Sequence, residues 1–163
     1  MSRLSEYIDV QCPFHYLTHH AERYFTVHRR DQKPGIFSLT IDLSDVGFPG
    51  KVQARHDVHM HYTIRKDAEK HDVIDLRWDP DDRFVPTFDG TLSGERLDGG
   101  NSRLRLAGTY DAPLGRVGVV FDAILGRRIA AATANALLRE IKQFVDADYK
   151  TALATTLASS PKE

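Results

Sequence analysis

Residues 129–149 read IAAATANALLREIKQFVDADY, and the spacing of their apolar side chains decides the fold. These side chains recur at intervals of three and four residues, the period of one face of an α-helix: Ala130, Ala134, Leu137, Leu138, Ile141, Phe144 and Val145. Residues 139, 140, 142 and 143 are charged or polar and fall mostly on other faces. The sequence therefore predicts one long amphipathic helix, from about Pro113 to Tyr149, whose apolar face must be buried.

Strand patterns precede this helix. Residues 4–12 alternate between apolar and polar side chains, and residues 14–24 carry a short helical stripe after Pro13. From Ile36 to Tyr110 the alternation repeats without a helical interruption, most clearly over residues 52–65. A curved antiparallel sheet of this kind needs a long apolar element to cover its inner face. The predicted fold class is α+β, with the sheet wrapped around the C-terminal helix.

Composition limits the classes of function. The chain has 163 residues, of which 41% are apolar and 28% charged, so we expect one domain over residues 1–150 and a flexible tail over residues 151–163. A formal net charge of -1 argues against binding to nucleic acid or to an anionic membrane surface. The single cysteine and the lack of an apolar N-terminal core favour the cytoplasm. No apolar run is long enough for an integral membrane segment.

Large side chains with one polar tip fall on the predicted inner face of the sheet. Tyr62, Trp78 and Tyr110 combine apolar area with a polar atom, and His56 lies on the same face. The glycines at 90, 94 and 108 also point inward, where a missing side chain allows curvature or the close approach of a helix. These residues can simply fill a core, or they can border an apolar cavity beneath the first turns of the helix. The residues predicted to bind a ligand in such a cavity are His56, Tyr62, Trp78, Phe88, Tyr110, Phe121 and Leu125.

Histidine pairs invite a metal interpretation, which the pattern does not favour. His59 and His61 lie two apart on one strand, and His15 and His19 lie four apart on the short helix. Neither pair has an evident third ligand nearby in the sequence, and the alternation points His59 and His61 outward. We predict no metal site and no cofactor.

No motif of an enzyme stands out. The glycines at 94–100 lack the ending of a phosphate-binding loop, and no serine lies in a nucleophile-elbow pattern. Cys12 reads as a small buried apolar residue. We therefore assign no catalytic residue.

Three stretches carry a resemblance to a known family: LRLAGTY at 104–110, PLG at 113–115 and VVFDAILGRRIA at 119–130. With the order of elements over residues 4–150, they resemble the helix-grip fold of the START-like (SRPBCC) superfamily. That group includes pollen-allergen-like lipid binders and polyketide cyclase/dehydratase-like proteins. The resemblance implies a cavity between sheet and helix that holds hydrophobic small molecules, and in some members performs chemistry.

Three functions remain open from the sequence. The first is binding or carriage of a hydrophobic small molecule such as a lipid, an isoprenoid or a polyketide-like compound. The second is a cyclase, dehydratase or hydrolase in which His56 or Tyr110 would transfer a proton. The third is a protein interaction module, or a homodimer, that uses the apolar stretch at 117–125.

Overall fold

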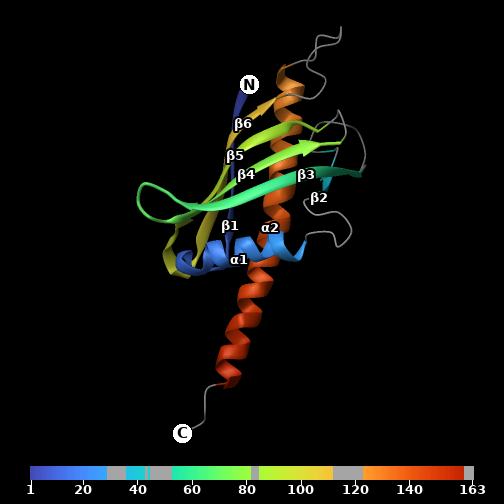
Figure 1. Cartoon of the computed structure of the whole chain (residues 1–163). Coiled ribbons are helices and arrows are strands. Elements are labelled where there is room, and N and C mark those ends of the chain that lie inside the picture. The colour runs from blue at the N-terminus through green and yellow to red at the C-terminus, as the bar shows by residue number, and fades with distance from the viewer. Residues whose placement is uncertain (29–35, 43, 45–52, 82–84, 112–122, 160–163) are drawn as a thin grey trace.

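The computed structural model describes residues 1–28, 36–42, 44, 53–81, 85–111 and 123–159. Its elements follow one another as β1 (Ser2–Val10), α1 (Phe14–Val27), β2 (Ile36–Asp42), β3 (Gln53–Lys66), β4 (Asp72–Pro80), β5 (Thr87–Arg96), the short 3-10 helix η2 (Asp98–Gly100), β6 (Ser102–Asp111) and α2 (Ala123–Ser159). Figure 1 shows the strands as a curved layer, with α2 running along its inner side and α1 crossing near one end.

The sheet is antiparallel throughout. Its strand order is β1-β6-β5-β4-β3-β2, so that β2 to β6 form a meander and the first strand joins the last. The sheet curls around α2 as a half-barrel (Figure 1). The α+β class and the helix-grip architecture predicted from the sequence are therefore confirmed.

Polar contacts along β1 fix the position of α2. The Asn135 side chain donates to Glu6 Oε2 at 3.2 Å, and Lys142 Nζ donates to the Asp9 carbonyl at 2.8 Å. Further along, the Gln11 backbone N–H donates to Asp146 Oδ1 at 2.7 Å. Residue numbers therefore increase in the same direction along β1 and α2. The helix runs parallel to β1 along the sheet edge.

The core lies between the sheet and the apolar face of α2. Ala130, Ala134, Leu137, Leu138, Ile141 and Val145 are almost fully buried there, and Phe144 is half-buried against them. This is the stripe predicted from the three- and four-residue spacing. On α1 the buried side chains are Leu17, His20, Ala21, Tyr24 and Phe25, which also recur at helical intervals.

Polar contacts hold α1 against α2. His20 Nδ1 lies 2.6 Å from Asp148 Oδ2, and the Tyr24 hydroxyl donates to Glu140 Oε2 at 2.8 Å. Burial raises the pKa of the Tyr24 phenol, and the adjacent Glu140 carboxylate adds to the shift. The phenol therefore stays a donor to Glu140 at neutral pH.

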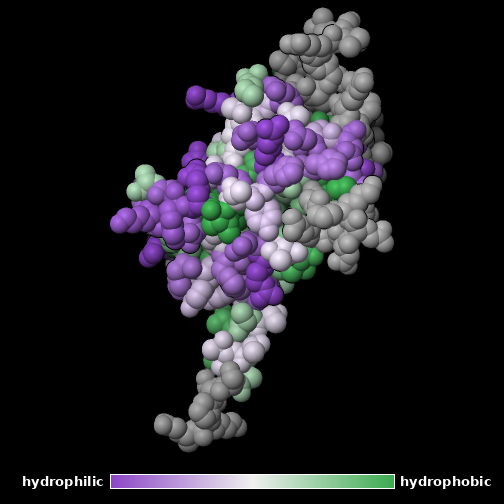
Figure 2. Space-filling view, in the orientation of Figure 1, coloured by the Kyte–Doolittle hydropathy of each residue, from purple (hydrophilic) through white to green (hydrophobic). Residues whose placement is uncertain are grey.

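The ends of α2 differ from the sequence-based expectation in one respect. The predicted helix end at Tyr149 is wrong, because α2 continues to Ser159 through part of the predicted tail. Residues 151–159 contain no glycine or proline, and the hydroxyl of Thr151 bonds to the carbonyl four residues earlier, as do those of Thr155 and Thr156. This segment projects from the body (Figures 1 and 2), and the side chains of 151–158 are exposed. The predicted helical residues 113–122 lie outside the described residues.

Candidate functional site

Trp78, Phe88 and Tyr110 form a row of rings across three strands. Trp78 is paired with Phe88 between β4 and β5, and Phe88 is paired with Tyr110 between β5 and β6. The Trp78 and Phe88 rings are stacked, with 4.3 Å between centroids. All three residues are buried, as the inward alternation predicted. We call these three residues the ring row.

A pair of glycines makes space for the ring row. Gly90 and Gly108 face each other on β5 and β6. A Cβ atom on Gly90 would lie 2.6 Å from Phe88 Cζ, and one on Gly108 would lie 2.9 Å from the same atom. The Phe88 ring therefore covers both glycines. The predicted room at these positions exists, and the Phe88 ring occupies it.

The third inward glycine serves a different contact. A Cβ atom on Gly94 would lie 2.7 Å from Leu17 Cδ2 and 3.2 Å from Phe14 Cε2. Both of these side chains belong to α1. The absence of a side chain at Gly94 thus lets α1 approach β5, which is the second role that the sequence predicted for inward glycines.

The first turns of α2 lie level with the ring row. Tyr110 is paired with Ser2, and Glu6, four residues further along β1, meets Asn135 of α2. Four strand residues span about 13 Å, which corresponds to about nine helix residues, so Gly126 lies near the level of Tyr110. Leu125 and Ile129 are partly buried and pack against the core at this end.

The polar atoms of the ring row differ in their bonding. Trp78 Nε1 donates a buried hydrogen bond to the Pro86 carbonyl at 2.9 Å, so this donor is already used. Among the described residues, the Tyr110 hydroxyl has no hydrogen-bond partner, and its oxygen is not fully buried. A phenol can both donate and accept. Tyr110 is thus the polar group of the row that a ligand can use.

The remaining predicted ligand-binding residues are not all brought together with the ring row. Tyr62 stacks on Phe25 of α1, with 5.0 Å between centroids, and its hydroxyl lies 3.5 Å from Thr26 Oγ1. It therefore packs on the last turns of α1. His56 is half-buried on β3, opposite Leu39 and beyond the last β3–β4 pair. Phe121 lies outside the described residues.

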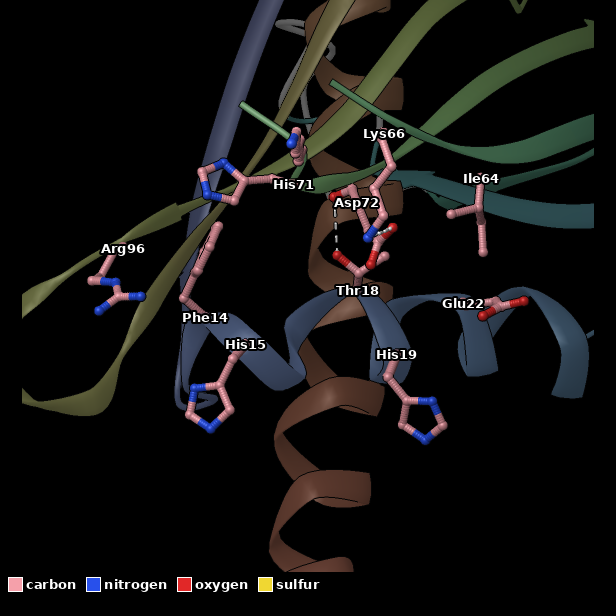
Figure 3. A pocket seen from close by; sticks show the side chains of 11 residues that line it. Phe14, His15, Thr18, His19, Glu22, Ile64, Lys66, His71, Asp72 and Arg96 are labelled. Atoms are coloured by element: carbon pink, nitrogen blue, oxygen red, sulfur yellow. Dashed lines mark hydrogen bonds and ion pairs between the residues drawn. The ribbon is translucent and has the colours of Figure 1, made fainter. Parts of the chain in front are cut away.

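An open pocket of about 540 Å³ lies on the outer side of α1. We call it the α1 groove; it is lined by one face of α1 from Phe14 to Glu22, by Ile64 and Lys66 at the end of β3, by residues 70–72, and by Arg96. Figure 3 shows that the labelled side chains come from both the helix and the sheet. The Thr18 hydroxyl donates to the Asp72 carbonyl at 3.1 Å and so ties the two walls together.

The sequence did not reveal the α1 groove. Its walls come from segments far apart in the chain, and most of its side chains are polar and exposed, as on any solvated surface. One partial signal was the inward Gly94, which predicted the approach of a helix to β5. Ile64 was expected inward but is 39% exposed and lines this groove.

Histidines that could suggest a metal lie on exposed surface. His59 and His61 point outward, as predicted, and His59 Nε2 lies 2.8 Å from Asp81 Oδ1, a carboxylate contact that sequence spacing did not predict. His15 and His19 project from the same side of α1 (Figure 3). Within the described ranges, no three potential ligands are placed to hold one metal ion.

Comparison with known proteins found similar solved structures but no similar sequence family. No protein-family model matches the sequence, and no curated protein matches it. TTHA0849 from Thermus thermophilus is 12% identical, with a TM-score of 0.49 over 90% of this chain and 99% of that one. The Zhui aromatase/cyclase from Streptomyces sp. R1128 is 12% identical, with a TM-score of 0.46 over 89% of this chain and 93% of that one.

The fold assignment rests on the architecture itself. A meander closed by its first strand, curled around a C-terminal helix, is the arrangement that the sequence resemblance implied. The chain has a helix-grip fold. Among the described helices of this helix-grip protein, none is both long and apolar enough to cross a bilayer.

Proposed function

We propose that the protein binds a hydrophobic small molecule between the ring row and the first turns of α2. The observation that carries the proposal is the Tyr110 hydroxyl, which has no partner among the described residues and stays accessible although Tyr110 as a whole is only 5% exposed. Ligand sites typically combine apolar walls with few polar groups that set the ligand's orientation. The ring row has this composition.

The opposite wall supports the same proposal. Leu125 and Ile129 are only partly buried, although they lie at the covered end of the sheet. Further along α2 the side chains that face the core are buried, including Leu137, Ile141 and Val145. Side-chain packing is thus less complete at the start of α2 than along its middle. A ligand at the start of α2 would displace fewer core side chains than one bound at its middle.

The ligand that fits is mainly apolar with one polar group. Lipid, isoprenoid and polyketide-like compounds have this character, and the polar group would exchange a hydrogen bond with Tyr110. We propose binding in preference to catalysis, because the ring row offers a single available polar atom. The interaction-module alternative depends on residues 117–125, of which only the last few are described; Ile124 among them is 60% exposed.

Charge placement supports a small molecule over nucleic acid as the partner. Arginines on the outer face of the sheet are paired with carboxylates at 2.6–3.5 Å: Arg65 with Asp75, Arg77 with Asp79, Arg103 with Asp9 and Arg105 with Glu95. Each of these four guanidinium groups thus has a carboxylate beside it, which disfavours phosphate contacts there. The lone cysteine is consistent with the proposed cytoplasmic setting.

Trp78 supplies the test, because it is the only tryptophan and belongs to the ring row. Fatty acids, isoprenoid alcohols and polyaromatics are titrated while its fluorescence is followed. We expect saturable binding, weakened by Tyr110→Phe for ligands with a polar group and unchanged for pure hydrocarbons. Tyr7→Phe is the control, since Tyr7 is exposed. Absence of binding across the panel, or equal binding by Tyr110→Phe for every ligand, would contradict the proposal.

A further inference from the structure

The two ends of the α1 groove differ in charge. Figure 3 shows Arg96, Phe14 and His71 together at one end, and Glu22 beside Ile64 at the other. Lys70 precedes His71 in the chain and also lines the groove. The groove lining therefore includes the cationic side chains of Arg96 and Lys70, while Glu22 lies at the end away from Arg96.

Arg96 is held in place without an acidic partner. Its guanidinium carbon lies 5.6 Å from the centre of the Phe14 ring, a cation–π contact. On another side of Phe14, the His71 ring makes an edge contact at 5.1 Å between centroids. No ion pair joins Arg96 to any described residue. Its N–H donors remain available to an anion.

Lys70 occupies a backbone conformation that lysine rarely adopts. Its φ is 64°, in the left-handed region that favours glycine or asparagine. Asp67 Oδ1 holds the turn by accepting hydrogen bonds from the backbone N–H groups of Glu69 and His71, each at 2.9 Å. The Lys70 ammonium has no acidic partner within the part of the chain that the structure describes. A fixed turn thus presents an unpaired cation at the groove.

Neighbouring carboxylates are largely committed elsewhere. Asp72 pairs with Lys66 at 2.7 Å. Asp67 and Glu69 lie 3.8 Å and 3.5 Å from His71 Nδ1 and do not line the groove. Arg96 and Lys70 therefore remain unpaired among the described lining residues, and the carboxylate of Glu22 lies at the end of the groove away from Arg96.

We propose that the α1 groove binds an organic anion, with its phosphate or carboxylate group on Lys70 and Arg96. The apolar part of the molecule lies along Phe14 toward Ile64. A volume of about 540 Å³ suits a small molecule. This site is on the outer side of α1 and is independent of the proposed interior site beside Tyr110.

The test uses phenyl phosphate as the probe, with benzyl alcohol as its neutral counterpart. Binding to the full chain is followed by amide chemical shifts in NMR. We expect shifts at residues 70–72 and 96 with phenyl phosphate only, and weakening of its binding by added salt. Lys70→Asn removes the charge and introduces a residue that tolerates the left-handed backbone, and Arg96→Gln removes the charge but keeps N–H donors. Each should weaken binding about tenfold, as the loss of a charge-assisted contact does, whereas the exposed Lys150→Gln should not.

A second arm identifies the source of the anionic group. Flotation with phosphatidylcholine vesicles is compared with vesicles that also contain phosphatidic acid. Retention on the second kind alone, lost in Lys70→Asn, would support the site and assign it to a lipid headgroup; binding of phenyl phosphate alone would support a free small molecule. Equal shifts with benzyl alcohol, or binding of every anionic probe unaffected by both variants, would overturn the proposal. Trp78 fluorescence should not respond to phenyl phosphate, which separates this result from binding at the ring row.

Discussion

Gly90 and Gly108 are paired across β5 and β6, and the Phe88 ring covers both of them. Two adjacent strands lack side chains at this point. The space that they leave is filled by Phe88, the aromatic residue of β5. Phe88 packs on bare backbone on one side and on the Trp78 ring on the other. The ring row therefore depends on these two glycines.

Gly108→Ala should destabilise the protein by about 1–3 kcal/mol or more, because the new Cβ overlaps backbone that cannot move freely. It would lie 2.3 Å from the Asp89 carbonyl oxygen and 2.5 Å from the Gly90 Cα. Urea unfolding measures the loss. Gly94→Ala is the matched control, since its Cβ meets only flexible side-chain ends of α1 and should cost less. An equal cost for both would contradict this account.

Burial of the α2 stripe predicts a strong effect of charge at Ile141, which is fully buried. Ile141→Asp places an unpaired carboxylate under the sheet, at a cost of several kcal/mol, and should unfold the domain. Gln143→Asp, on the exposed face of the same helix, should change the melting temperature little. Circular dichroism on heating compares the two. An unchanged melting temperature for Ile141→Asp would show that this face is not buried.

The Cys12 thiol should make the stability of the folded protein depend on pH in the alkaline range. Burial raises the pKa of its thiol from 9.0 to about 12, and the carboxylates of Asp146 and Asp148 add to the shift. The unfolded chain releases this proton above about pH 8.5, whereas the native chain retains it. The native protein therefore binds more protons, and its stability falls as pH rises from about 8.5 toward 12, by at most about 1.4 kcal/mol per unit.

The measurement compares wild type with Cys12→Ala. Unfolding free energies are collected from about pH 8 to 9.5, because the Tyr24 phenol adds its own effect once the unfolded chain loses that proton near pH 10. The decrease of the unfolding free energy with rising pH should be less steep in Cys12→Ala than in the wild type. Identical slopes would mean that the Cys12 thiol titrates alike in the native and unfolded chains.

The absence of a metal site remains a prediction. His59 and His61 are exposed on the outer face of β3, and His59 is already engaged by Asp81. Protein purified without an affinity tag should contain no stoichiometric transition metal by elemental analysis. A bound metal that is lost when both histidines are changed to alanine would contradict this expectation.

Periodicity explains what could be predicted from the sequence. The spacing from Ala130 to Val145 fixed which face of α2 is buried, and the alternation around Trp78 and Tyr110 placed these rings inward, because both patterns are local consequences of backbone geometry. Two outcomes depend on tertiary contacts that no local pattern encodes. One is the packing of Tyr62 on Phe25 of α1, which removes Tyr62 from the ring row. The other is the α1 groove, whose walls are distant in sequence.

The projecting end of α2 supplies the last prediction. Side chains 151–158 are all exposed, and this stretch includes Leu153 and Leu157 at 44% and 74% exposure. Because these residues bury little surface in the single chain, a protein ending at Lys150 should unfold at nearly the same temperature as the full chain. This outcome would support the predicted domain of residues 1–150. Differential scanning calorimetry is paired with light scattering on both chains. A lower melting temperature together with a smaller mass for the shortened chain would instead show that the exposed leucines are covered by a second copy, as in the homodimer that the sequence left open.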